Sequence, residues 1–320
     1  MTANDLYDST IIGGGPAGLS AAMMLGRARR RILIVDDESP RNRFTQHMHA
    51  VVGFDGAAPD ELRRRGRLEL AQYDVTFVTS STTRVDDDGD RLRVQTDAGS
   101  YATRTLINAT GAVDELAPID GLAQLWGSRI LHCPYCHGWE VRDKRIAVIA
   151  TALMGLFQAE LLRQWTSTLT AFIADAGAVD ETAIERMKAR GTQVNAEPVE
   201  RISRRADGAL DIVTRDGVAT TVDAVFTGST LIPRDLGLPD ALERTSTGFL
   251  VVDGNGRSNH PRIWSAGNAA NPYANVPMSM GNGSAVGGAV NLALVEEDSA
   301  LVLSAAAEEL PAIACNYASA

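Results

Sequence analysis

Near its N-terminus the chain reads Ser9-Thr10-Ile11-Ile12-Gly13-Gly14-Gly15-Pro16-Ala17-Gly18, and this stretch decides the fold. Its first four residues have the composition of a short buried strand, and residues 19–27 have the pattern of a helix. Gly13, Gly15 and Gly18 therefore lie between a strand and a helix, with the spacing of a dinucleotide-binding turn. In such a turn the glycines allow a tight bend, close approach of backbone to a pyrophosphate, and close packing of helix on strand. The start of the helix offers amides and a positive dipole end to the phosphates.

A second predicted strand, residues 31–35, leads to Asp36, which is placed to accept hydrogen bonds from ribose hydroxyls. The strand, helix and strand together form a βαβ unit at the start of the chain. The residues that follow predict one more helix and four strands, at 61–73, 75–78, 82–86, 92–96 and 101–107, with an acidic hairpin turn at 86–90.

The same plan returns in the second half, where a strand, a helix and a strand are predicted at 145–149, 153–165 and 168–174. Further helices and strands are predicted at 184–190, 199–225, 249–252, 263–267 and 284–294, and the alanine-rich tail from residue 300 suggests more helix. Residues 106–111 and residues 224–229 are short segments of similar sequence, one at the end of each half. We therefore predict an α/β fold with two Rossmann-like nucleotide-binding domains. The first would be discontinuous, and the second would be inserted into it, with residues 1–117 and 247–320 in the first and residues 118–246 in the second.

The composition argues against several classes of protein. A net charge of −10 leaves no basic surface to neutralise phosphates, so nucleic acid is not an expected partner. The arginine runs 29–31 and 63–65 are assigned to helix ends, where positive charge suits the helix dipole. No apolar run reaches membrane-spanning length and the first residues lack a basic signal start, which predicts a cytoplasmic protein without membrane contact. Three cysteines are too few for a secreted scaffold held by disulfides.

The motif that carries most chemistry is Cys133-Pro134-Tyr135-Cys136-His137. In a reducing compartment, two cysteines at this spacing are more often catalytic than structural. Thiolate rather than thiol attacks a disulfide, and a histidine, with an ordinary pKa of ~6.5, can take up the proton. Other interpretations stay open. Covalent haem attachment needs export and an axial ligand, a zinc site needs a second Cys or His pair, and a static disulfide is unusual in the cytoplasm.

The remaining histidines and the third cysteine carry less weight. His132 adjoins the cysteine pair and could assist it or simply pack beside it. We expect ordinary loop residues or cofactor contacts at His47, His49 and His260. We expect Cys315 to be a buried, inert thiol, with a third redox cysteine as the alternative.

The chain resembles the low-molecular-weight thioredoxin reductases, which are two-dinucleotide flavoproteins, over nearly its whole length. The resemblance rests on the glycine turn, the cysteine block 133–140, Ala109-Thr110-Gly111 and Ala266-Gly267-Asn268. It implies that FAD is bound, that Cys136 faces the flavin, that Cys133 exchanges with substrate, and that two copies form a homodimer. Asn268 departs from the aspartate that is usual in the family, but an amide can still hydrogen-bond the ribityl chain. The residues implied to hold FAD are Gly13, Gly15, Pro16, Ala17, Gly18, Asp36, Thr110, Gly111, Gly267, Asn268, Asn275 and Val276, with a helix opening near residues 281–283 directed at the flavin.

The glycine turn of the second half is damaged. Thioredoxin reductases bind NADPH at this turn, but in the matching stretch Ala150-Thr151-Ala152-Leu153-Met154-Gly155 two of the three glycines are alanine. A Cβ at Ala150 resists the positive φ of such a turn, and a Cβ at Ala152 blocks the approach of backbone to pyrophosphate. The arginines that would bind the 2′-phosphate are missing, and Asp175 would repel it. The sequence therefore predicts no productive NADPH binding, although residual nucleotide binding stays open.

These features resemble a group of thioredoxin-reductase-like dithiol oxidases that close disulfides in sulfur-containing antibiotics such as gliotoxin, holomycin and romidepsin. The resemblance implies that a small-molecule dithiol reduces a disulfide between Cys133 and Cys136, with His137 deprotonating the substrate thiol. The pair then reduces FAD, and dioxygen reoxidises the flavin to give hydrogen peroxide. Two alternatives stay open: a thioredoxin-type disulfide reductase fed by NAD(P)H or ferredoxin, and a redox sensor or binding module without turnover.

Overall fold

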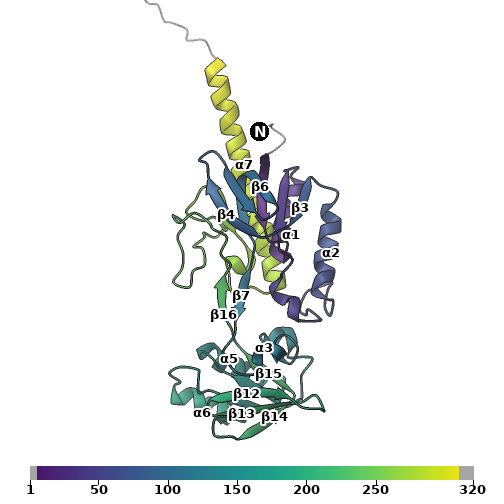
Figure 1. The fold of residues 1–320 in the computed structure, drawn as a ribbon, viewed down its shortest axis with the longest axis vertical. Coiled ribbons are helices and arrows are strands. Elements are labelled where there is room, and N and C mark those ends of the chain that lie inside the picture. Colours follow the sequence, from purple (N-terminus) through teal and green to yellow (C-terminus); the bar gives the residue numbers. More distant parts are fainter. Residues whose placement is uncertain (1–5, 310–320) are drawn as a thin grey trace, which may run out of the picture.

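The computed structural model describes residues 6–309, which form two α/β parts joined by a narrow connection (Figure 1). The expectations for the first five residues and for Cys315 concern segments outside the described residues. Among residues 6–309, no helix is both long enough and apolar enough to cross a membrane.

A seven-stranded sheet forms the first part. Its strands are β1 (Leu6–Ile12), β2 (Ile32–Asp36), β3 (Val75–Thr79), β4 (Thr82–Asp87), β5 (Leu92–Thr96), β6 (Gly99–Asn108) and β17 (Ile263–Ser265). The order is β3-β2-β1-β6-β5-β4, and β17 pairs in parallel with the C-terminal end of β6. The strands β3, β2, β1 and β6 are parallel, while β5 and β4 are antiparallel. Every residue of β2 is buried, as expected for a parallel strand that is covered on both faces.

Two long helices, α1 (Pro16–Arg27) and α7 (Val276–Glu309), pack closely on this sheet, and α2 (Pro59–Leu70) lies beside α1. The close approach of α1 and α7 needs glycine, because a Cβ at position 283 would overlap the backbone of Ala17. The predicted helix at 284–294 is longer than expected, and the predicted opening near 281–283 is wrong. The helix begins earlier because Asn275 Oδ1 accepts a hydrogen bond from the Met278 amide (3.0 Å) and so caps the first turn.

The second part has a five-stranded parallel sheet and a small antiparallel sheet. The parallel strands are β11 (Thr192–Asn195), β10 (Leu169–Phe172), β9 (Ile146–Ile149), β15 (Ala224–Thr227) and β8 (Ile130–Leu131), in that order. The antiparallel strands are β12 (Val199–Arg204), β13 (Leu210–Thr214) and β14 (Ala219–Val222). Its helices are α3 (Leu122–Leu125), α4 (Pro134–His137), α5 (Leu153–Leu162) and α6 (Glu181–Ala189). This is the predicted second Rossmann-like unit, in which β9, α5 and β10 repeat the arrangement of β1, α1 and β2.

The connection between the parts is a two-stranded antiparallel ribbon of β7 (Ala112–Glu115) and β16 (Thr230–Pro233), visible at the middle of Figure 1. On β7, Asp114 receives two hydrogen bonds from Arg41 (2.9 and 2.7 Å) and one from the Ser229 hydroxyl (2.6 Å). After β16 the chain packs on the first sheet at once, since Leu236 and Leu238 belong to the same buried cluster as Ile12. The return to the first part therefore comes before the predicted boundary at residue 246.

The strand predicted at 249–252 is not formed. Phe249 and Leu250 are buried, as their apolar character requires, but within residues 6–309 the only strand-type pairing of this segment is an isolated bridge between Leu250 and Arg244. An apolar run indicates burial, and it does not by itself supply a neighbouring strand with free backbone groups.

Candidate active site

A cavity of about 1220 Å³ lies between the two parts and contains the predicted site. All predicted site residues line this cavity except Gly18, which lies beneath the glycine turn. The volume exceeds the ~300–1,000 Å³ typical of pockets for one small ligand. The cavity walls come from the glycine turn after β1, the loop before α7, the cysteine block and the start of α5.

Glycine is needed at each of the three positions of the first turn for a different structural reason. Gly13 has φ 105°, and a Cβ there would overlap the carbonyl oxygen of Ala109. A Cβ on Gly18 would overlap the carbonyl of Gly13, so this glycine lets α1 pack on the strand. Gly15 differs, because an added Cβ would meet no protein atom within 4 Å. Gly15 thus leaves bare backbone facing the cavity, which suits a pyrophosphate.

Asp36, at the end of β2, is held by two arginines of α2. Its Oδ2 atom accepts hydrogen bonds from Arg63 and Arg67, each at 3.0 Å. Burial raises the pKa of Asp36, but the Gly14 amide and the two guanidinium groups outweigh it and hold the pKa below its usual value. The assignment of the run 63–65 to a helix end is therefore wrong, because these residues lie in the middle of α2 and Arg63 orients the buried acid. The result is an ionised acceptor on the cavity wall.

Asn268 shapes the loop that leads into α7. Its Nδ2 atom donates to the backbone carbonyls of Asn271 (3.0 Å), Pro272 (3.1 Å) and Ala274 (2.8 Å). An ionised aspartate, which only accepts hydrogen bonds, could not make these contacts. The asparagine at this position therefore has a structural role in addition to its place on the cavity wall.

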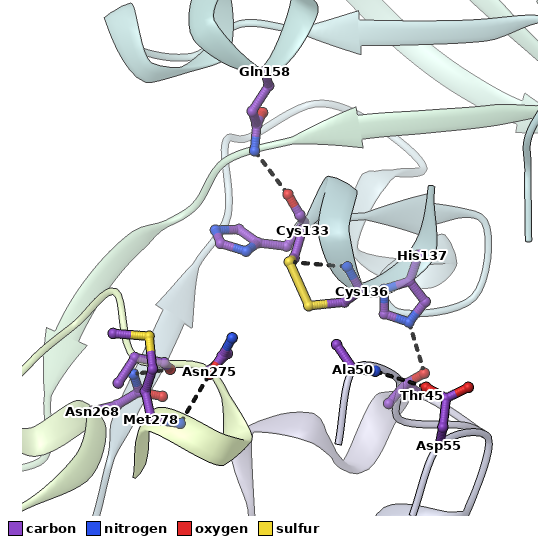
Figure 2. The surroundings of a disulfide bond; sticks show 12 residues. Thr45, Ala50, Asp55, Cys133, Cys136, His137, Gln158, Asn268, Asn275 and Met278 are labelled. Carbon is purple, nitrogen blue, oxygen red and sulfur yellow. Dashed lines mark hydrogen bonds between the residues drawn. A yellow bond between two sulfur atoms is a disulfide. The ribbon is translucent and has the colours of Figure 1, made fainter. Parts of the chain in front are cut away.

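Cys133 and Cys136 form a disulfide, with their Cα atoms 5.2 Å apart, and both residues are half-buried on the cavity wall (Figure 2). Pro134 opens the short helix α4, and Cys133 caps it, since its Sγ accepts a hydrogen bond from the Cys136 amide (3.2 Å). Gln158 of α5 donates to the carbonyl of His132 (2.8 Å) and ties the disulfide segment to the helix after the second turn. A closed redox pair is thus held rigidly beside the first turn's cavity.

The tautomer of His137 follows from its contact with Thr45. The Thr45 hydroxyl donates its single proton to the His47 carbonyl (2.9 Å), so it must accept from His137 Nε2 at 3.2 Å (Figure 2). The proton of the neutral ring is therefore on Nε2, and Nδ1 carries the lone pair. Nδ1 is buried and has no hydrogen-bond partner among the described atoms.

Burial lowers the pKa of His137, the nearby His49 lowers it further, and Glu140 offsets part of the change. The rings of His137 and His49 are 6.2 Å apart, and the His49 ring nitrogens lie 3.6 Å from Asp55 and from Glu140. His137 is therefore neutral at physiological pH and ready to accept a proton. Burial and Arg41 likewise lower the pKa of His132, against a smaller opposite effect of Asp114.

The other histidines differ in position. His47 and His49 line the cavity beside His137, whereas His260 binds Asp87 (3.1 Å) away from it. The sequence does not predict the role of Thr45, because no local pattern indicates that this threonine will contact His137 in the other part of the fold. Among residues 6–309, no group of three His, Cys, Asp or Glu side chains is arranged to hold a metal ion.

The second turn differs from the first at the positions where alanine replaces glycine. Ala150 follows β9 as Gly13 follows β1, but it does not have the positive φ of Gly13. The side chain of Ala150 fills the space beside Gly155, where an added Cβ would lie 2.6 Å from it. Ala152 presents its Cβ at the cavity, in the position where Gly15 presents bare backbone.

Comparison with known proteins agrees with this geometry. A family profile described as pyridine nucleotide-disulphide oxidoreductase matches residues 7–287. The thioredoxin reductase tcpT of Claviceps purpurea is 30% identical over 306 residues, covering 90% of this chain and 94% of the relative. The thioredoxin reductase sirT of Leptosphaeria maculans is 28% identical over 319 residues, covering 93% and 98%. The crystal structure of HlmI superposes with a TM-score of 0.89 at 35% identity, covering 96% and 98%. The predicted fold and the resemblance to thioredoxin-reductase-like enzymes are confirmed.

Proposed function

Since this chain belongs to the pyridine nucleotide-disulphide oxidoreductase family, we propose that it oxidises a small-molecule dithiol of a sulfur-containing natural product to its intramolecular disulfide. Dioxygen is the final acceptor, so that dithiol and dioxygen give disulfide and hydrogen peroxide. One observation carries the proposal: a single cavity joins the intact glycine turn to the disulfide and to His137, while the second turn carries Ala150 and Ala152.

The cofactor we propose is FAD, and the cavity fits it. Gly15 offers unobstructed backbone to a pyrophosphate, Asp36 offers an ionised acceptor to a ribose, and Asn275 and Val276 line the cavity at the positively polarised start of α7. When bound, FAD would accept the electron pair from the reduced cysteines and pass it to dioxygen. The alanines of the second turn support a reaction in which NADPH is not an electron donor.

The residues of the chain supply the sulfur chemistry. His137 takes the proton of one substrate thiol, and the thiolate attacks Cys133 Sγ, which breaks the Cys133–Cys136 bond and releases Cys136 as a thiolate. The second substrate sulfur then attacks the sulfur bound to Cys133 and closes the product disulfide, and its proton passes to the departing Cys133, which leaves as a thiol. Two electrons and two protons have moved from the substrate to the site.

Replacing His137 with alanine is expected to lower kcat/KM for dithiol oxidation by about 10²-fold near pH 6 and by much less near pH 9. The neutral ring is the active form, and because its pKa is lowered it still accepts a proton at mildly acid pH. Free thiols ionise by themselves near pH ~8.5 and then need no base. The measurement is the pH profile of oxygen uptake. His260→Ala is the matched control, since that ring binds Asp87 outside the cavity. An unchanged profile in His137→Ala would contradict the role.

The function itself is tested by oxygen uptake with a panel of reduced dithiols, with and without NADPH. We expect uptake that depends on the dithiol and is unaffected by NADPH. Mixing the yellow protein with NADPH under argon should leave the flavin absorbance unchanged, whereas a disulfide reductase would lose its colour. Absence of uptake with every dithiol, together with no loss of colour on mixing with NADPH, would favour a sensor or binding module.

We also propose that the protein is a homodimer in the cytoplasm, as its resemblance to thioredoxin reductases implies. Large apolar side chains exposed on α1 and α7 support a second copy on this side of the first part: Met24, Leu292 and Val295.

A further inference from the structure

Helix α5 has two apolar faces, and only one of them is covered. Leu156, Ala159 and Leu162 are buried in the core of the second part. Met154 and Phe157 lie three residues apart on another face, 55% and 59% exposed, and both line the cavity. Leu161, one further turn along the helix, lines it as well. A helix that served only to receive a pyrophosphate at its start would not need this second apolar face.

The disulfide segment adds a third large side chain to the wall of this cavity. Tyr135, which stands between the two cysteines, is 67% exposed and lines the same cavity. Its ring packs edge-on against Trp165, with centroids 5.9 Å apart, so the side chain is supported from behind. Helix α4 contacts α5 directly. Large apolar side chains gathered in a cavity indicate a ligand that covers them. We call Tyr135, Met154 and Phe157 the apolar platform.

The part of the cavity wall that carries Met154 and Phe157 is uncharged. The cavity-lining residues of the second turn and α5 are all uncharged: Thr151, Ala152, Met154, Gly155, Phe157, Gln158 and Leu161. Arg41 and Asp114, which also line the cavity, form an ion pair in which their opposite charges cancel. His132 and His137 are neutral because burial lowers the pKa of both. An anionic substrate would find no counter-charge on the second turn or on α5, whereas a neutral substrate has no charge to desolvate there.

We propose that the apolar platform binds the hydrocarbon flank of a neutral dithiol and places its sulfur atoms at Cys133, beside the second turn, where this chain has Ala150 and Ala152 in place of glycines. This inference rests on the proposed function and names its class of substrate: small, uncharged and apolar, rather than a charged thiol or a protein.

The test compares Phe157→Ala and Met154→Ala with Leu153→Ala in the flavin-loaded enzyme. Leu153 is the matched control, because it is 58% exposed on the same helix but does not line the cavity. With benzene-1,2-dimethanethiol as substrate, we expect Phe157→Ala to raise KM about tenfold with little change in kcat, because the lost contact is the same in the ground and transition states. With dithiothreitol, which has no apolar flank, KM should change less than about twofold in every variant. Leu153→Ala should behave as the parent protein.

Charge is tested with dihydrolipoamide and dihydrolipoate, which share one dithiol and differ by a carboxylate. We expect kcat/KM for the amide to exceed that for the acid by about tenfold. Calorimetric binding of the cyclic disulfide of benzene-1,2-dimethanethiol provides a readout apart from turnover, and its Kd should also rise about tenfold in Phe157→Ala. Equal effects in Leu153→Ala and Phe157→Ala, a preference for dihydrolipoate, or a lower KM for reduced thioredoxin than for any small dithiol would overturn the inference. Weaker binding in Phe157→Ala without oxygen uptake by the parent would overturn the proposed function alone.

Discussion

A Cys136→Ser variant is expected to lose dithiol oxidation by at least about 10³-fold while it keeps its fold and its flavin, because a nucleophilic side chain that forms the covalent intermediate has no substitute. Serine cannot form the disulfide that accepts the substrate's electrons. The backbone amide of residue 136, which donates to the capping Cys133 Sγ, is retained, so α4 should persist. Oxygen uptake measures the loss, and the flavin spectrum and thermal melting check the rest.

The two cysteines can be told apart in the same experiment. In Cys136→Ser, the remaining thiol of Cys133 should attack the product disulfide and form a mixed disulfide that mass spectrometry detects. Cys133→Ser should be equally inactive but should form little of this adduct, if Cys136 faces the flavin. Undiminished oxidation in either variant would remove the disulfide from the mechanism.

A Gly15→Ala variant is expected to fold normally and to bind FAD about 100-fold more weakly, since its Cβ would stand where the pyrophosphate approaches. An added Cβ meets no protein atom within 4 Å, and the residue has φ −81°, which alanine adopts freely. The apo-protein should therefore change in free energy of unfolding by less than about 0.5 kcal/mol. Flavin release followed by fluorescence gives the affinity, and thermal melting of the apo-protein gives the stability.

Gly13→Ala is the contrasting variant. At φ 105° and against the Ala109 carbonyl, its Cβ is strained whether or not a cofactor binds. The expected cost is roughly 1–3 kcal/mol of stability in the apo-protein, together with loss of flavin. If Gly15→Ala kept full affinity for FAD, the dinucleotide would have to lie elsewhere in the cavity.

The elements that sequence reasoning predicted well are those with local signals. The glycine turn after β1, the alternation of strands and helices in both halves, and the cysteine block each depend on residues close together in the chain. The start of α7 was misplaced because its signal, a capping Asn275, was not used. The strand at 249–252 was wrongly predicted because burial of Phe249 and Leu250 is satisfied by packing without pairing.

The environment of the site was the harder part. Thr45 and His49 reach His137 only because the loop after β2 folds over the cysteine block of the other part. Arg63 reaches Asp36 across the space between α2 and β2, and a run of three arginines in sequence does not reveal which one turns inward. The apolar face of α5 was present in the sequence as Met154, Phe157 and Leu161, but the buried face of the same helix masks its spacing.

The hydrogen bond from His137 to Thr45 spans the two parts of the molecule at the point of reaction. Thr45 belongs to the part that carries the glycine turn, and His137 to the part that carries the disulfide. Any swing about the β7–β16 ribbon that separated them would free the imidazole to exchange tautomers and, by the same movement, withdraw the oxidising sulfurs. The base and the disulfide would therefore leave the site together, so a protein whose two parts had separated would not oxidise thiols.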